Sequence, residues 1–571
     1  MIRISNFKSQ IANLRFLIRN LRAIPFSLCL CASVVAWLSS CRNANPFTDE
    51  DFYVPVSEEG DRRTIEAVEL TDHSTTPPVS VEDAAAAMSQ DWKPAPIIEP
   101  GAPIELSLAE VRAAALANNL DLRVALYDPS ISQTFIDEER ARFEWAFTAN
   151  ARHNEIDAPT ASQLNNSQAT LDDFDFGVSI PMRTGGEVAV NLPVSRTSTN
   201  NQFSTLNPAY ESDLRFSISH PLLRNAGVRP NTHGIRVARW QAEISDALTK
   251  LEAIRVLAIA DRAYWRLYAV RKALEVAQQQ YELAFAQLER ARRLFNAGEV
   301  PGLDVTRAES GVAQTLESII LAENELLARQ RELKVIINRP DLPVGSTNII
   351  VPTTEPNPVL LELARSDLSD FAVSNRMEML EQEIRLAIDA SEIDFARNQK
   401  LPLVLVDYSY NVNGLSGNLG NSFDSLGSNR FQDWSAGISV EIPLGNEAAE
   451  SRLERAILSR VQRLATRQQR ELSIRQEVEN AVDSLESNWQ RILAARQSVI
   501  LAAEVLAGEE RMYGVGEDRT STDVLNAAAD LADAQLSEIR ALVDYQISQV
   551  DIAFATGTIL GQTLVTWEPL E

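Results

Sequence analysis

Apolar residues recur along much of this chain at alternating steps of three and four positions. The first stretch keeps this spacing at Ala253, Val256, Ala260, Ala263, Leu267, Val270, Leu274, Ala277, Tyr281, Ala284, Leu288, Ala291 and Phe295. The next keeps it at Val305, Ala308, Val312, Thr315, Ile319, Ala322, Leu326, Leu333 and Ile336, with only Arg329 intruding between Leu326 and Leu333. Such heptad seams predict two long helices that pack along their length.

The same arrangement returns about 218 residues later. Its seam runs through Ile474, Val478, Ala481, Leu485, Ile492, Ala495, Val499, Ala502, Leu506 and Tyr513. Residues 448–513 contain no proline, so as one helix they would reach roughly 100 Å at 1.5 Å per residue. In both copies a short segment from a glycine to an aspartate interrupts the seam. The duplication predicts two helical hairpins, at 235–338 and 448–557.

Several helices carry a second apolar line beside the first. Leu316, Ile320 and Leu327 form such a line next to the downstream seam. A helix with two seams can contact a neighbour on each side, as the staves of a closed cylinder do, whereas a two-stranded coiled coil needs one seam. The pattern therefore favours an assembly of hairpins, and an ordinary coiled-coil bundle is the alternative.

Between the helical stretches, apolar and polar residues alternate with period two. This pattern predicts amphipathic strands at 143–156, 173–180, 187–196, 211–220, 403–411 and 434–442. The strand blocks end at Pro221 and Pro443, where a residue that cannot donate to a ladder suits a turn into helix. Residues 184–186, Thr-Gly-Gly, predict a tight turn. The number of membrane strands stays open between six and four, because the 173–196 pair could form an extramembrane hairpin.

The N-terminus resembles a bacterial lipoprotein export signal. Arg15, Arg19 and Arg22 precede an apolar run from residue 24 to 38, and Leu-Ser-Ser leads into Cys41. Cys41 is the expected lipidation site, carrying palmitate, and an ordinary cleaved signal is the alternative. The other cysteines stand at 29 and 31, inside the apolar run, so the mature chain would hold no disulfide.

Composition narrows the function classes. The formal net charge is −26, which disfavours nucleic acid because phosphates would be repelled. The four histidines lack metal-ligand spacing, and no phosphate-binding glycine loop or nucleophile motif occurs. We therefore expect no enzyme activity, no cofactor and no metal. Residues 41–103 are acidic and proline-rich, which is typical of an extended tether.

At the turns the chain resembles the TolC-like outer-membrane efflux channel family. The segments that carry the resemblance are Phe-Asn-Ala-Gly298 through Asp304-Val305, and Gly-Val-Gly516 through Arg519-Thr520 to Asp523-Val524-Leu525. The resemblance covers about residues 104–560. It implies a homotrimer with a shared β-barrel in the outer membrane and an α-helical tunnel in the periplasm. It also implies partnership with a periplasmic adaptor and an inner-membrane pump, in efflux or type I secretion.

The expected fold is thus mostly α with a membrane β-barrel portion, built from two tandem repeats. The expected segments are a signal peptide at 1–40, the tether at 41–103, a first repeat at 104–340, a linker at 341–360, a second repeat at 361–560 and a tail at 561–571. The expected location is the outer membrane, anchored by lipid. A periplasmic coiled-coil adaptor without a pore is the alternative function.

The turns are the expected periplasmic mouth. Their candidate residues are Gly298, Asp304, Gly516, Arg519, Asp523 and Asn526. We expect the two glycines to be helix C-caps with positive φ and the two aspartates to be N-caps of the returning helices. An acidic ring at this mouth, paired with Arg519, is a second hypothesis. Asn526 weakens it, because the family commonly has an acidic residue there.

Overall fold

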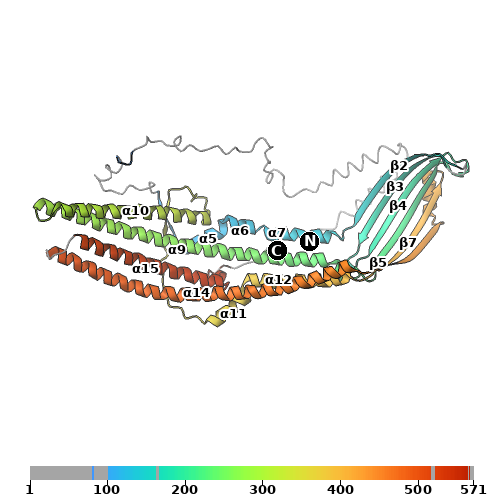
Figure 1. Cartoon of the computed structure of the whole chain (residues 1–571). Coiled ribbons are helices and arrows are strands. Elements are labelled where there is room, and N and C mark those ends of the chain that lie inside the picture. Colours follow the sequence, from blue (N-terminus) through green and yellow to red (C-terminus); the bar gives the residue numbers. More distant parts are fainter. Residues whose placement is uncertain (1–79, 83–100, 162–165, 516–520, 564, 566–571) are drawn as a thin grey trace. The chain divides into compact units, whose positions relative to one another are not determined.

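The computed structural model describes residues 80–82, 101–161, 166–515, 521–563 and 565. The chain divides into two units, Met1–Ala85 and Ala86–Glu571, and all named elements lie in the second (Figure 1). They are, in chain order, β1 Pro103–Leu106, α5 Leu108–Asn118, α6 Leu120–Ala125, α7 Asp128–Ala141, β2 Ala146–Asp157, β3 Gln168–Pro181, β4 Glu187–Thr199, β5 Ala209–Pro221, α8 Val228–Asn231, α9 His233–Ala297, α10 Gly302–Ile337, β6 Ile349–Pro352, α11 Arg365–Asn375, α12 Met377–Gln399, β7 Leu403–Ser416, α13 Leu419–Gly427, β8 Gln432–Glu441, α14 Glu447–Val515, α15 Ser521–Ala555 and α16 Ile559–Gln562.

Long helical hairpins dominate this unit. Helices α9 and α14 have 65 and 69 residues. Helix α9 packs against α10, α14 packs against α15, and α15 also packs against α9. The seam of the first hairpin is buried or half-buried over its length, except that Phe295 is 49% exposed at the end of α9. The predicted heptad seams are therefore confirmed.

The six predicted strand segments form one antiparallel sheet. Its order is β2-β3-β4-β5-β7-β8, and β5 pairs with β7 to join the strands of the two repeats. The pair β3–β4 lies inside this sheet, between β2 and β5, so it is not a separate hairpin. Residues 182–186 form the predicted tight turn, with Gly185 at φ 94°. In Figure 1 the sheet lies at one end of the long helices.

Ser107 and Glu110 have the spacing of a capping box, which predicts one helix from there to about Leu126, and the structure differs from this prediction on both sides of the cap. Residues 103–106 are a strand that pairs in parallel with β6. The helix then begins at Leu108 under the predicted capping box of Ser107 and Glu110, and it breaks at Asn119, whose backbone is extended. The pairing with β6 joins residues 246 positions apart, such as Pro103 and Ile349, and a local pattern cannot reveal such a partner.

The strands turn into the long helices at the two predicted prolines. Pro221 is the last residue of β5 and is buried. Pro443 follows the end of β8 by two residues, and Gly445 and Asn446, both with positive φ, complete the turn into α14. Within the described ranges, no helix is both long and apolar enough to cross a bilayer.

Candidate functional site: the sheet faces and the hairpin tips

One face of the sheet is apolar. Strand pairing places one residue of each strand in a continuous row, formed by Phe147, Val178, Val190, Phe216, Tyr410 and Trp434. Neighbouring rows on this face hold Phe174 with Val194 and Val406 with Ile438. Trp434 is 69% and Ile438 72% exposed. A sheet that presents such rows outwards requires an apolar surrounding.

The opposite face is polar. Its middle row is Thr148, Gly177, Asn191, Arg215, Asn411 and Asp433. The Arg215 Nε donates to Asn411 Oδ1 at 3.1 Å, and Asn411 Nδ2 donates to Asp433 Oδ1 at 2.6 Å. These cross-strand bonds order the polar row. The polar face is therefore suited to contact with water, whereas the apolar face is not.

The two outer strands of the sheet each have one partner. Strand β2 pairs only with β3, and β8 only with β7, among the described strands. All twelve residues of β2 are exposed. Long exposed edges are templates for pairing with another chain. The outer strands of this sheet are therefore suited to pairing with the outer strands of further copies, which would close the sheets into a barrel.

The first helical tip ends as the sequence predicts. Gly298 is the C-cap of α9, with φ 79° in the left-handed region. Its N–H donates to the Phe295 carbonyl at 2.9 Å, and the Glu299 N–H donates to Leu294 at 2.9 Å. Glycine adopts this conformation without the strain that a Cβ would bring.

The N-cap prediction for Asp304 is wrong. Helix α10 begins at Gly302 with Pro301 as its N-cap, so Asp304 is the third helical residue. Its carboxylate pairs with Arg307 Nη1 at 3.3 Å. Proline lacks an N–H and its fixed φ suits a helix start, and the helix therefore begins three residues earlier than an N-cap at Asp304 would place it. The carboxylate still lies in the first turn, where the helix dipole favours it.

The second tip is described in part. Gly516 and Arg519 lie outside the described residues. Helix α15 has begun by Ser521, so Asp523 stands inside the helix and its N-cap prediction is also wrong. Asn526 is exposed one turn later.

Contacts that the sequence does not predict join the two tips. The Arg290 guanidinium on α9 lies 4.5 Å from the centre of the Tyr513 ring at the end of α14. Leu525 of α15 packs on a small core between α9 and α10 that includes Leu288 and Val312. These contacts bring both turns to the end of the helices remote from the sheet (Figure 1). Only the tertiary pairing of the hairpins reveals them, because both partners look like ordinary helix residues.

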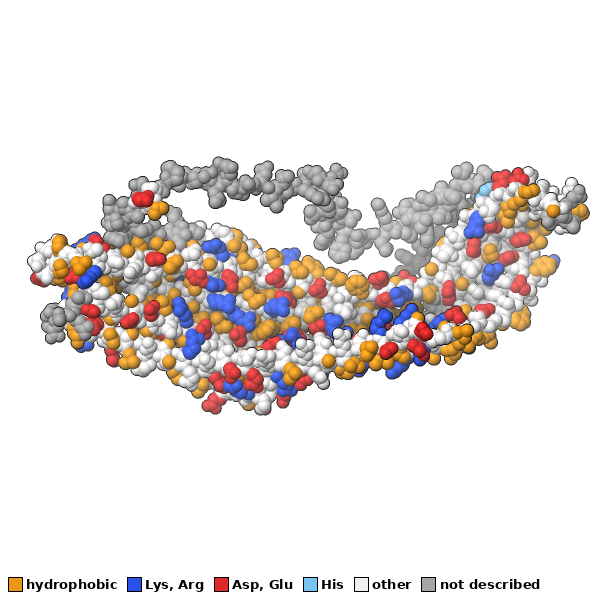
Figure 2. Space-filling view, in the orientation of Figure 1, with side chains coloured by type: hydrophobic (Ala, Val, Ile, Leu, Met, Phe, Trp, Pro, Cys, Tyr) orange, Lys and Arg blue, Asp and Glu red, His pale blue; other side chains and the backbone are white. Residues whose placement is uncertain are grey.

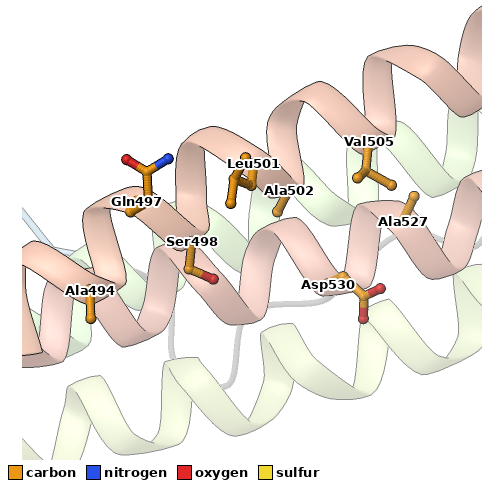
Figure 3. A pocket seen from close by; sticks show the side chains of 8 residues that line it. All are labelled: Ala494, Gln497, Ser498, Leu501, Ala502, Val505, Ala527 and Asp530. Atoms are coloured by element: carbon orange, nitrogen blue, oxygen red, sulfur yellow. The ribbon is translucent and has the colours of Figure 1, made fainter.

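Apolar surface continues outside the hairpin of α14 and α15. A groove of about 450 Å³ runs along it, and most of its lining is apolar or small. Figure 3 shows Leu501, Ala502 and Val505 of α14 and Ala527 of α15 around it, with Asp530 at one end. Leu501 and Val505 are exposed. Figure 2 shows further hydrophobic side chains gathered near the sheet, where α14 begins; Ile442 and Leu444 are among the exposed ones.

Within the part of the chain that the structure describes, no group of three or more His, Cys, Asp or Glu side chains is arranged to hold a metal ion. Cys41 lies outside the described residues, as do most of the tether and most of the predicted tail.

In its paired long hairpins and its two-faced antiparallel sheet, the chain resembles one class of membrane protein, the outer-membrane efflux channels. Residues 368–558 match the sequence profile of the family described as Outer membrane efflux protein. The predicted resemblance to the TolC-like channels is confirmed, in sequence across the second repeat and in fold across most of the chain.

Individual relatives carry the same resemblance. The chain is 25% identical to Outer membrane protein TolC of Escherichia coli (strain K12) over 333 residues, which are 57% of this chain and 66% of that protein. TolC of Vibrio cholerae is 25% identical over 312 residues, 53% of this chain and 68% of the relative. The match thus spans about two thirds of these relatives.

Solved structures show the same fold. The Campylobacter jejuni CmeC outer membrane channel superposes with a TM-score of 0.61 at 15% identity, covering 79% of this chain and 85% of that one. A membrane protein from Pseudomonas aeruginosa gives 0.62 at 18% identity, covering 82% and 94%.

Proposed function

We propose that three copies of this chain form an exit channel across the outer membrane. The observation that carries the proposal is the sheet, which has an apolar face, a polar face and two unpaired edges. If β8 of each copy pairs with β2 of the next, the edges disappear and a barrel closes. Its apolar rows then face lipid and its polar rows face the lumen, as in outer-membrane barrels.

The helices support the same assembly. In a single chain Leu501, Val505 and other α14 side chains remain in water, at a cost of about 25 cal/mol per Å² of apolar surface. Neighbouring copies would cover them and complete a helical cylinder in the periplasm. The polar and small residues on the groove allow the close approach that such a contact needs.

The channel would act passively within a larger system. The resemblance favours an inner-membrane pump that delivers substrates and a periplasmic adaptor that docks on the helical end. Outer-membrane lipid surrounds the barrel, and a lipid on Cys41 anchors the chain. The arrangement needs no catalytic group, since a pore lowers a barrier by providing a polar path.

The helical tips are the proposed periplasmic mouth. Threefold repetition would bring Asp304, Asp523 and Asn526 of each copy towards one axis. Ion pairs near a protein surface are worth under about 1 kcal/mol each, so the closed mouth would open when an adaptor supplies a modest binding energy. Arg519 and Gly516 belong to the same proposal.

A periplasmic adaptor or scaffold without a pore is the second candidate. It would share the long hairpins, but it gives no role to a sheet whose apolar rows are exposed over five or six strands. Residues such as Trp434 and Ile438 would then remain in water.

Two measurements on the purified full-length protein test the proposal. Mass measurement in detergent should give a trimer, and planar-bilayer recording should give discrete conductance steps. The intact mass of the mature chain should show an N-terminal acylated Cys41. A monomer without conductance would favour the adaptor, and a mature chain that begins elsewhere would remove the lipid anchor.

A further inference from the structure

The two repeats contribute unequally to the sheet. Each runs from shorter helices into strands and then into a long helical hairpin, but the first supplies β2, β3, β4 and β5 while the second supplies only β7 and β8. In this alignment of the repeats β2 corresponds to β7 and β5 to β8. The hairpin β3–β4 therefore lies between the corresponding strands as an addition.

The added hairpin is a full part of the wall. Val178 of β3 and Val190 of β4 stand in the same apolar row as Phe147 before them and Phe216 after them. On the polar face, Gly177 leaves room for its neighbours, since a Cβ there would lie 2.4 Å from Asn191 Oδ1 and 2.7 Å from Thr148 Oγ1. The apolar and the polar residues of β3 and β4 thus lie on the same faces of the sheet as those of β2 and β5.

The turn of this hairpin is also fixed at the helical side of the sheet. The Gly227 N–H donates to the Thr184 carbonyl at 3.0 Å, and a Cβ at Gly185 would lie 2.1 Å from the Asn225 carbonyl. The turn thus packs on the connection from β5 to α9. Its strands have the same span as their neighbours, which a hairpin outside the membrane would not need.

We propose that the β3–β4 hairpin widens the membrane pore, so that the channel passes large polar solutes, polypeptides included. This inference rests on the proposed function, because closure needs three copies. Three copies give eighteen strands instead of the twelve that two-stranded repeats would give. A barrel's diameter grows about linearly with its strand number, and barrels of sixteen to eighteen strands leave an aqueous channel.

The width follows from ordinary sheet dimensions. With strands ~4.8 Å apart and tilted by ~40°, eighteen strands close at ~36 Å between backbones and twelve at ~24 Å. Side chains occupy ~5 Å on each side, half the spacing of packed sheets, which leaves ~26 Å against ~14 Å. The lining suits polar cargo, with Asn191, Arg215, Asn411 and Asp433 in its middle row.

Thiol labelling with reagents of increasing size, added from outside the cell, measures this width. The reagents enter through the barrel, so the result does not depend on whether the helical tips are open. Ser217 stands on the polar face, between Ala189 and Ser409, so S217C places a thiol in the lumen. Maleimide-linked polyethylene glycols of increasing diameter should react up to ~26 Å. The matched control is F216C, one residue away on the apolar face, which should stay unlabelled in membranes.

The deletion variant replaces residues 158–208, which include β3 and β4, by a short Gly-Ser turn that joins Asp157 to Ala209. Because Phe147 and Phe216 share a row, β2 and β5 can pair with their faces preserved. With S217C, its labelling limit should fall to ~14 Å, about half. A variant that shortens only residues 200–208 keeps all strands and should keep the full limit.

Three results would overturn the inference. One is a limit near 14 Å in the full chain; another is an equal limit in the full chain and the hairpin deletion. If the deletion does not assemble, the strand number in the wall of the full-length trimer decides, with eighteen supporting the inference and twelve overturning it. A trimeric pore with a narrow limit contradicts only the inference, whereas a protein that forms no trimer contradicts the proposed function.

Discussion

Arg376 and Glu378 form a nearly buried ion pair where α11 meets α12. Both residues are less than a tenth exposed. Arg376 Nε donates to Glu378 Oε2 at 3.1 Å, and Arg470 adds a contact of 3.2 Å from α14. Burial alone would raise the pKa of Glu378, but the hydrogen bonds and charge of Arg376 outweigh it, so its pKa lies below the usual range. The carboxylate is thus held in its charged form.

The variant Glu378→Gln should lower the stability of the folded protein by about 2–3 kcal/mol, because the buried Arg376 would keep only the half-exposed Glu477 as an ion-pair partner. Since the folded pKa of Glu378 is depressed, its contribution is present above the unfolded pKa and is lost as pH falls through the folded pKa. Thermal unfolding in detergent from pH 7 to 3 should show a smaller acid loss for the variant. Equal slopes would contradict this linkage. Asp367→Asn, at an exposed position of α11, is the control.

The aspartates of the tips supply a second prediction at this scale. Replacing Asp304 and Asp523 together with alanine should raise conductance while trimer yield stays nearly unchanged. Neither residue is an N-cap, so the loss of dipole interaction costs each helix only about 0.3–1 kcal/mol. Planar-bilayer recording and trimer yield give the two readouts. Failure to assemble would make the aspartates structural, and unchanged conductance would place the gate elsewhere.

At the scale of the elements, a substitution of Gly298 tests how much this C-cap stabilises the end of α9. Gly298→Ala should destabilise this tip by about 1 kcal/mol, because a Cβ at φ 79° is strained even though no heavy atom lies within 4 Å of it. Gly508→Ala is the matched control, inside α14 and equally free of neighbours. It should stabilise by about 0.5–1 kcal/mol. Hydrogen exchange of residues 290–300 should accelerate in the first variant alone.

Elements with a periodic signal could be predicted from the sequence, whereas those that depend on distant partners could not. The seams, the six strand segments, the turn at 184–186 and the Gly298 cap follow from local patterns that packing respects. The pairing of β1 with β6 and the contact of Arg290 with Tyr513 depend on how the hairpins meet. The start of α10 could not be predicted, because the sequence offers both Pro301 and Asp304 as the N-cap. The backbone of the structure places Pro301 there.

At the scale of the whole molecule, we expect that charged substitutions in the groove on α14 prevent trimer assembly. Leu501→Glu with Val505→Glu should reduce trimer formation at least tenfold, since two charges would be buried against the next copy at a cost of several kcal/mol. Leu501→Met with Val505→Ile keeps the surface apolar and should assemble normally. Mass photometry in detergent separates the two results. A trimer from the charged variant would show that α14 faces solvent in the assembly.

The unequal strand numbers of the two repeats also determine how many equivalent binding positions a trimer offers to its partners at each end. In a trimer, the hairpins α9–α10 and α14–α15 alternate around the axis, and their similar tips make six nearly equivalent positions. The outer mouth alternates between four strands and two, so it has three equivalent positions. A partner on the periplasmic side could therefore bind in six copies, while a ligand of the outer surface would bind in three.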